Sequence, residues 1–200
     1  MSTTTARFYG ALIAIGALIW AATRLVIGVP AEGVNHPVEI WGSFAFQLGI
    51  VAFLAVAWAT KATGTGRGGR AVLAVELVLL TMAIGWTIPH LWQANRPHDD
   101  LWIQILDAGW PFSMLGLIAV GVAIARARRW PGAARWLPLA ASLLIVVDIA
   151  LVWLPVEISH VITFVYLAVA YTLLGGVVMR DVAPLLESGS SALVQAPTRG

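Results

Sequence analysis

The chain contains no cysteine, and only 11% of its 200 residues are Asp, Glu, Lys or Arg. Without cysteine it has no disulfides, thiolate metal sites, cysteine-attached haem or cysteine nucleophiles. A typical soluble domain carries about 25% charged residues. This scarcity of charge, with a hydrophobic share of 60% and a mean hydropathy of +0.86, excludes an ordinary soluble protein.

Long apolar segments recur along the chain, and six reach the roughly 20 residues that cross a hydrocarbon core of about 30 Å. They predict an all-α bundle of six transmembrane helices in one domain, residues 1–184, with a disordered cytoplasmic tail over residues 185–200. We treat the N-terminus as retained, because its apolar stretch is longer than that of a signal peptide. The predicted spans are Phe8–Val29, Ile40–Thr60, Ala71–Trp92, Leu101–Ala125, Trp136–Leu154 and Ile158–Arg180.

The cations in the loops predict the orientation, because short loops rich in Lys and Arg stay in the cytoplasm. Two loops on one side hold Lys61, Arg67, Arg70, Arg126, Arg128, Arg129 and Arg135. The loops on the other side hold mainly acids, with Arg96 as their one cation. This asymmetry predicts a multi-pass protein of the cell membrane with both termini cytoplasmic. The cations are split between loops without aromatic readers, so we expect no nucleic-acid partner.

Most other ionisable side chains fall in the predicted outer half. They are His36, His90, His98, His160, Arg24, Glu39, Asp107, Asp148 and Glu157. An ionisable group at membrane depth costs about 2.5–3.5 kcal/mol on insertion scales, so the group implies mutual pairing or a shared polar cavity.

Helical spacing predicts which side chains share a face, because residues three or four apart are neighbours on a helix. Four such stripes can converge on one outer pocket. The sixth span contributes Glu157, His160, Phe164 and Tyr171, and the third contributes Glu76, Trp86 and His90. The fourth span contributes Gln104 and Asp107 beside Trp110, and the first contributes Trp20 with Arg24. We predict that Trp20, Trp41, Trp92, Trp102 and Trp153 form an interfacial aromatic belt, whereas Trp86 and Trp110 line the pocket. Pro89 and Pro111 either kink their spans and widen the outer half, or have their freed carbonyls satisfied by neighbours.

Two identical tetrapeptides, Pro37-Val-Glu-Ile40 and Pro155-Val-Glu-Ile158, stand where spans begin. Proline in the first turn followed by Glu suits a helix N-terminus, and that role alone accounts for the pattern. The Pro-x-Glu pattern also resembles part of the Pro-x-Glu-Glu element of small membrane lycopene cyclases, although Ile40 and Ile158 replace the second acid.

The plan of a short, aromatic-rich bundle is similar to integral-membrane terpene cyclases of meroterpenoid and indole-terpenoid pathways. The chain has six predicted spans where the fungal members have seven, and its acids lie on the outer side. The resemblance implies acid-initiated cyclisation of a lipophilic isoprenoid substrate.

The residues themselves support such chemistry. A buried carboxyl can protonate an olefin, and aromatic faces stabilise the carbocation that follows. The candidate acids and bases are Asp107, Asp148, Glu39 and Glu157; the candidate substrate-binding residues are Trp86, Trp110, Phe164, Tyr171, His90 and His160. This chemistry requires no metal or cofactor. The expected partners are the lipid bilayer and a lipophilic small molecule.

Two other functions are compatible with the same residues. A proton-coupled carrier could use Glu76, Asp148 and the outer cluster as stations on a polar path. A haem, metal or quinone site could use His90 and His160 from two spans. A membrane anchor or partner subunit without chemistry of its own stays open as well. Gly10, Gly16, Gly175 and Gly176 allow close helix approach, either within the chain or between copies in a homo-oligomer.

Overall fold

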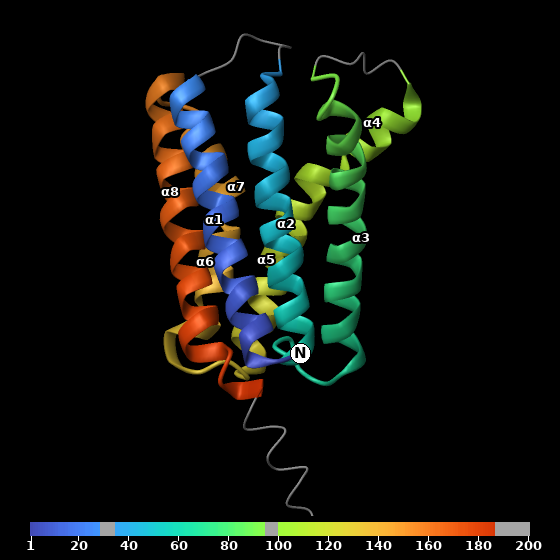
Figure 1. The fold of residues 1–200 in the computed structure, drawn as a ribbon, viewed down its shortest axis with the longest axis vertical. Coiled ribbons are helices and arrows are strands. Elements are labelled where there is room, and N and C mark those ends of the chain that lie inside the picture. Colours follow the sequence, from blue (N-terminus) through green and yellow to red (C-terminus); the bar gives the residue numbers. More distant parts are fainter. Residues whose placement is uncertain (29–34, 95–99, 187–200) are drawn as a thin grey trace, which may run out of the picture.

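The computed structural model describes residues 1–28, 35–94 and 100–186, and in this part of the chain it contains helices and no strands. The all-α prediction is therefore confirmed. The helices, drawn in Figure 1, are α1 (Thr3–Ile27), α2 (Pro37–Ala59), α3 (Arg67–His90), α4 (Leu101–Asp107), α5 (Gly109–Ala127), η1 (Gly132–Arg135), α6 (Leu137–Ser142), α7 (Leu144–Ala150), α8 (Val156–Val177) and η2 (Val178–Val182).

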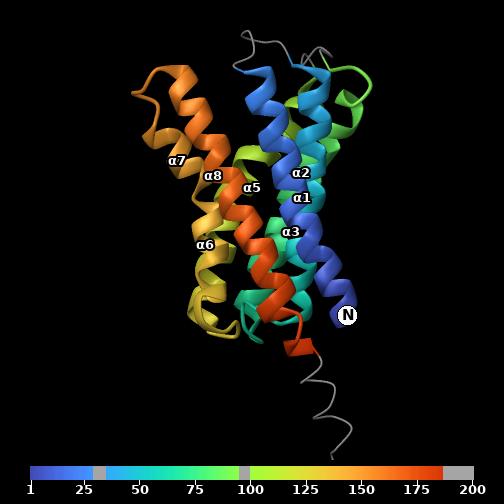
Figure 2. The same cartoon turned by 60° about the vertical axis from the view of Figure 1, so that its left-hand side comes forward.

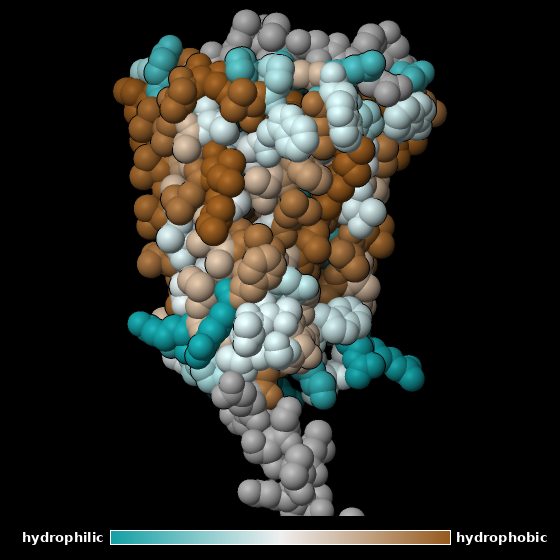
Figure 3. Space-filling view, in the orientation of Figure 1, coloured by the Kyte–Doolittle hydropathy of each residue, from teal (hydrophilic) through white to brown (hydrophobic). Residues whose placement is uncertain are grey.

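Helix lengths and composition agree with the predicted spans in outline. Within the described residues, five helices are long and apolar enough to cross a membrane, with α4 and α5 taken together and α8 continued into η2; a sixth is added if the bent pair α6 and α7 forms one span. On the face shown in Figure 3, a mainly brown apolar zone covers the middle of the molecule, between two ends that carry teal polar side chains. Exposed apolar side chains lie within the long helices, for example Val78 in α3 and Val169 and Leu173 in α8, which suits contact with lipid.

The predicted helix starts at the two Pro-x-Glu elements are confirmed. α2 begins at Pro37, and α8 begins directly after Pro155. Proline has no backbone N–H, but the N–H groups in the first turn of a helix have no partner within the helix, so nothing is lost there. Glu39 and Glu157 place negative charge at the positive end of each helix dipole.

The two ends of the bundle differ in charge. The basic end, where α1 and α3 begin, carries Arg7, Lys61, Arg67, Arg70, Arg126, Arg128, Arg129, Arg135 and Arg180. The acidic end, where α2 and α8 begin, carries Glu39, Asp100 and Glu157. The described chain starts and stops at the basic end (Figures 1 and 2). The predicted tail from residue 187 onward lies outside the described residues.

The fifth predicted span, Trp136–Leu154, is wrong as a single helix. α6 and α7 are separate, and the axis bends by 47° between residues 132–142 and 144–150. The hydroxyl of Ser142 donates to the carbonyl of Leu139 at 2.8 Å, and such bonds within a helix favour bending. The hydroxyl of Tyr166 in α8 donates to the carbonyl of Ala140, which supplies a further partner at the bend.

The fourth span is also divided, and here the sequence indicated the reason. Pro111 cannot donate a hydrogen bond to the carbonyl of Asp107, and its ring crowds that carbonyl. The chain accordingly ends α4 at Asp107 and begins α5 at Gly109. Of the two alternatives for the prolines, a local break accompanies Pro111, whereas Pro89 lies one residue before the end of an unbroken α3.

Small residues bring the first and last helices together. A Cβ atom added to Gly10 would lie 2.7 Å from the carbonyl oxygen of Gly175, and one added to Gly175 would collide with the carbonyl of Gly10. Gly16 approaches the backbone of Ala45 in α2 in a similar way. These three glycines are used for contacts within the chain, whereas Gly176 has no neighbouring atom within 4 Å of an added Cβ.

The adjacent Gly175 and Gly176 provide a matched pair for a stability test. Gly175→Ala places a methyl group against backbone of α1, so we expect the free energy of unfolding to fall by about 1–3 kcal/mol. Gly176→Ala meets open space, so we expect it to be neutral or to stabilise the helix by about 0.5–1 kcal/mol. Thermal unfolding in detergent, followed by circular dichroism, measures both. Equal melting temperatures for the two variants would contradict the close packing of α1 on α8.

Candidate functional site

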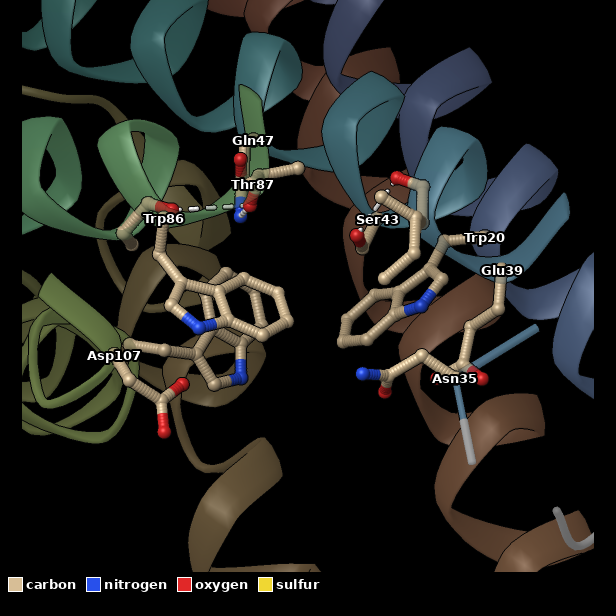
Figure 4. Close-up of a pocket in the computed structure, with 11 residues that line it drawn as sticks. Trp20, Asn35, Glu39, Ser43, Gln47, Trp86, Thr87 and Asp107 are labelled. Atoms are coloured by element: carbon tan, nitrogen blue, oxygen red, sulfur yellow. Dashed lines mark hydrogen bonds between the residues drawn. The ribbon is translucent and has the colours of Figure 1, made fainter. Parts of the chain in front are cut away.

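A first cavity lies between α2, α3 and the break between α4 and α5, in the half of the bundle near the acidic end. Its volume is about 160 Å³. It is lined by Trp20, Asn35, Glu39, Ile40, Ser43, Gln47, Ala83, Trp86, Thr87, Asp107 and Trp110. In Figure 4, Trp86 and Asp107 stand on one side of the gap, and Trp20, Glu39 and Asn35 stand on the other. Indole rings thus face carboxyl and amide groups across a small space.

A second, larger cavity adjoins the first and is bounded by α1, α5, α7 and α8. Its volume is about 420 Å³. It is lined by Trp20, Arg24, Trp110, Pro111, Met114, Leu144, Ile145, Asp148, Val156, Ser159, His160, Thr163 and Phe164. Trp20 and Trp110 therefore belong to both cavities and form the wall between them.

That wall is an aromatic cluster built from four helices. Trp20 stacks on Phe46 at a centroid distance of 5.0 Å and meets Trp110 and Phe164 edge to face, at 5.5 Å each. Phe46 in turn meets Tyr171 at 4.8 Å. Edge-to-face aromatic pairs are favourable and directional, so the cluster fixes how α1, α2, α5 and α8 sit around the cavities.

An ion pair joins the two cavities at the acidic end. Arg24, which lines the second cavity, donates through Nη1 to Oε1 of Glu39, which lines the first. Both side chains are mostly buried, with 17% and 18% of their surface exposed. The Nε2–H of His160 donates to the carbonyl of Arg24 at 2.9 Å, and the guanidinium lies 5.0 Å from the ring centre of Phe164. Arg24 thus ties α1 to α2 and α8.

The two candidate aspartates lie in different cavities. Asp107 is the last residue of α4 and lines the first cavity. Asp148 in α7 lines the second, and it accepts a hydrogen bond from the hydroxyl of Thr163 at 3.1 Å. Both are also exposed at the surface of the bundle. Each carboxyl therefore stands where its cavity opens to the outside.

Gln47 is a polar cavity residue that the sequence analysis did not select. Its side chain is 3% exposed, and its amide nitrogen donates to the hydroxyl of Thr87 at 2.8 Å. That hydroxyl donates to the carbonyl of Ala83, so it is available only as an acceptor for Gln47, which fixes the orientation of the amide. Among the described residues, Oε1 of Gln47 has no hydrogen-bond partner. A buried, unpaired acceptor costs about 1–3 kcal/mol, so this end of the cavity suits a ligand or water that donates a hydrogen bond.

The predicted substrate-binding residues divide into lining and supporting groups. Trp86, Trp110, His160 and Phe164 line a cavity. His90 is buried beside Trp86, with its ring stacked on the indole at 4.0 Å and its Nδ1–H donating to the carbonyl of that tryptophan at 2.7 Å. Tyr171 is buried against Phe46 and lines neither cavity.

The remaining sequence candidates lie elsewhere. Glu157 is exposed in the first turn of α8, outside both linings, and His36 caps the start of α2. His98 lies outside the described residues. The belt assignment is wrong for Trp20, which is 9% exposed, whereas Trp41, Trp92, Trp102 and Trp153 are exposed. Trp20 follows Ile13 and Ala17 on one face of α1, and that apolar spacing was the signal for its burial.

Glu76 is fully buried in α3, nearer the basic end than the cavities. Its Oε1 accepts a hydrogen bond from Ser113 in α5 at 2.6 Å. Its Oε2 faces Gly116 and has no hydrogen-bond partner in the described part of the chain. Because Gly116 has no side chain, the carboxyl can fit between α3 and α5.

Metal coordination has little support in this arrangement. Residues 1–28, 35–94 and 100–186 contain no group of three or more His, Asp or Glu side chains placed to hold a metal ion. His90 and His160 each use one ring nitrogen on a backbone carbonyl, and only His160 lines a cavity.

Comparison with protein families, curated proteins and solved structures finds no match.

The Arg24–Glu39 pair can be tested by a double-mutant cycle. Removal of either partner leaves a mostly buried charge without its counterion, so we expect Arg24→Met and Glu39→Met each to lower the free energy of unfolding by about 1–3 kcal/mol. The double variant should lose less than the sum, with a coupling of about 0.5–3 kcal/mol.

Thermal and denaturant unfolding in detergent give these values, and Asp100→Asn, an exposed acid at the same end, is the control. Strict additivity of the two single variants would show that the pair does not hold α1 and α2 together.

Proposed function

We propose that this protein is an integral-membrane enzyme that cyclises a lipophilic isoprenoid substrate within the two adjoining cavities. The observation that carries the proposal is the shared wall of Trp20 and Trp110, with Asp107 in one cavity and Asp148 in the other. Acid and base groups thus flank aromatic faces, and lipid-facing helices surround them. The general plan of a short, aromatic-rich bundle, which resembles membrane terpene cyclases, is consistent with this function, whereas the acids of the Pro-x-Glu elements have no proton-transfer role in it.

The second cavity is suited to the hydrocarbon part of the substrate. Met114, Leu144, Ile145 and Phe164 supply apolar lining, and the cavity volume of about 420 Å³ can hold part of a prenyl chain. The first cavity, with Gln47 and Ser43 in its lining, is suited to a polar end such as a hydroxyl group. The substrate then lies across the Trp20–Trp110 wall.

The proposed reaction begins with proton transfer from a carboxylic acid to a terminal double bond or epoxide. The π electrons form the new C–H bond, or the C–O bond of the epoxide opens as its oxygen takes the proton, and a carbocation is left. A neighbouring double bond attacks that cation and forms the ring. A carboxylate then removes a proton from the cyclic cation and restores a double bond, so the product is an isomer of the substrate.

Asp107 and Asp148 are the residues proposed for the two proton transfers, one at each side of Trp110. The hydroxyl of Thr163 orients Asp148. Glu39 is engaged by Arg24, so its role is to position the helices and the cavity wall. Glu157 is the least suited of the four candidate acids, because it lies outside both linings.

A carrier is the second candidate, and the buried carboxyl of Glu76 favours it. Glu76 lies between the cavities and the basic end, where a polar path across the bilayer needs an intermediate station. Such a protein would move a proton or solute without changing its covalent structure.

Expression in a cell that supplies linear polyprenyl alcohols and epoxides tests the enzyme directly. We expect lipid extracts to contain a new compound of unchanged mass and altered chromatographic retention. Asp148→Asn and Asp107→Asn should each reduce its formation by about 10²–10⁴-fold, because each removes a proton-transfer group. Asp100→Asn, outside both cavities, should retain wild-type formation.

Full activity in both cavity variants would refute this assignment. Proton-driven uptake by vesicles without conversion, abolished by Glu76→Gln, would favour the carrier instead.

The aromatic wall gives a second prediction. Trp110→Ala removes a π-face worth about 0.5–2 kcal/mol to a nearby cation, so product formation should slow by about 2- to 30-fold. Trp153→Ala, at a tryptophan that is 90% exposed, is the matched control. Initial rates in membranes with equal amounts of folded protein measure the effect. Equal initial rates for the two variants would show that the cavity wall has no part in the mechanism.

A further inference from the structure

The basic end carries far more positive charge than it can neutralise within the described residues. Nine of its side chains are Lys or Arg, whereas Asp181 is the one described acid there, and it is paired with Arg180 at 2.8 Å. Charge of this density at the end of an apolar bundle attracts an anionic surface. Four of the cations, Arg126, Arg128, Arg129 and Arg135, lie close together at the end of α5 and in η1.

Two open hollows indent the surface where these arginines lie. The larger, of about 680 Å³, separates the start of α3 from the end of α5 and includes Arg126 and Arg129 in its lining. The smaller, of about 320 Å³, includes Arg126, Arg128 and Arg135. Both contain Val122, so the two hollows meet on one face of α5.

The larger hollow has an apolar part and a charged part. Val72, Ala119, Val122 and Ala123 line it toward the middle of the bundle, and the arginines line it toward the end. Gly68, in the first turn of α3, has no neighbouring atom within 4 Å of an added Cβ, so backbone is accessible there at the positive end of that helix dipole. A molecule with a hydrocarbon chain and a negative head matches this order of surfaces.

The arginine segment is held in place by a buried tryptophan. Trp130 is 1% exposed, and its Nε1–H donates to the hydroxyl of Thr60 at 3.0 Å. It also meets Phe53 edge to face. The chain after α5 is therefore fixed against the end of α2, so the adjacent Arg128 and Arg129 are carried on a constrained backbone.

Two exposed tryptophans indicate the level of a bilayer at which the hollows would lie. Trp58 near the end of α2 and Trp136 beside the smaller hollow are 53% and 52% exposed. The guanidinium of Arg135 lies 5.4 Å from the ring centre of Trp136. Exposed tryptophan beside arginine is typical of the headgroup level of a bilayer, where the ring contacts acyl chains and the cation contacts phosphate.

We propose that the larger hollow binds an anionic phospholipid. Arg126 and Arg129 contact its phosphate, and Val72, Ala119 and Val122 contact the start of an acyl chain. Arginine suits this ligand because its planar guanidinium donates two parallel hydrogen bonds to phosphate oxygens. The binding is independent of any reaction in the cavities at the acidic end, so failure of one proposal leaves the other intact.

Native mass spectrometry of the full chain in neutral detergent tests the proposal with phosphatidylglycerol and phosphatidylcholine of identical acyl chains. We expect phosphatidylglycerol to be retained preferentially. Arg126→Gln and Arg129→Gln should each weaken that preference by about fivefold, and the double variant by about 25-fold. The matched control is Arg67→Gln with Arg70→Gln, which removes the same charge from exposed positions outside both hollows.

The controls separate a lipid site from general charge attraction. Thermal unfolding of both double variants checks that they fold, and the single variants carry the test if the double variant does not. Equal retention of the two lipids, or equal losses in the two double variants, would overturn the proposal. Displacement of the lipid by soluble glycerol phosphate at the same concentration would overturn it as well, since the hollow would then be a phosphate site without selectivity for lipid.

Discussion

The packing of Trp20 against Phe46, Trp110 and Phe164 is the interaction on which the rest of the structure depends. One side chain of α1 reaches three other helices, α2, α5 and α8, and fills the space that would otherwise join the two cavities. The ion pair of Arg24 with Glu39 lies one turn further toward the acidic end and repeats the connection between α1 and α2 with polar groups. The aromatic packing and, one turn nearer the acidic end, the ion pair together set the shape of the cavities.

Side-chain size governs where the helices approach and where they separate. Gly10 and Gly175 bring α1 and α8 into backbone contact near the basic end. Toward the acidic end, indole and imidazole rings occupy the same interfaces and hold the helices apart. The break after Asp107 and the bend at α6 and α7 add to this separation. The interface between α1 and α8 is consequently tight near the basic end and wider toward the acidic end.

The fold could be predicted further than the site. Apolar length located the long helices, Pro37 and Pro155 indicated helix starts, and Pro111 marked a place where the fourth span could kink, because a missing donor has local consequences that a sequence displays. At the bend between α6 and α7 the hydroxyl of Ser142 donates to the carbonyl of Leu139, and Tyr166 contacts the same region from α8. The effect of a single serine on a helix, and a contact across 26 positions, are not visible in hydropathy.

For the site, helical spacing placed Trp86, Trp110, Asp107 and His160 at cavities, because each stripe faces the bundle interior. Spacing within one helix could not decide how far a stripe extends. Glu157 shares a stripe with His160 but lies one turn nearer the surface, and Tyr171 lies deeper, among Phe46 and its neighbours. Gln47 was not predicted as a site residue because its amide carries no charge. Its hydrogen bond with Thr87 nevertheless makes it a defined polar group in the first cavity.

The contact of Gly10 with Gly175 joins two helices that are far apart in the sequence, so α1 is synthesised well before its partner α8. α8 supplies His160, Thr163 and Phe164 to the second cavity, so that cavity acquires this part of its wall only when α8 has been made. Until then α1 presents Gly10 and Ala14 without their partner helix. Assembly of this cavity therefore requires α8, and a chain that stops before residue 156 retains α1 to α7 without a closed second cavity.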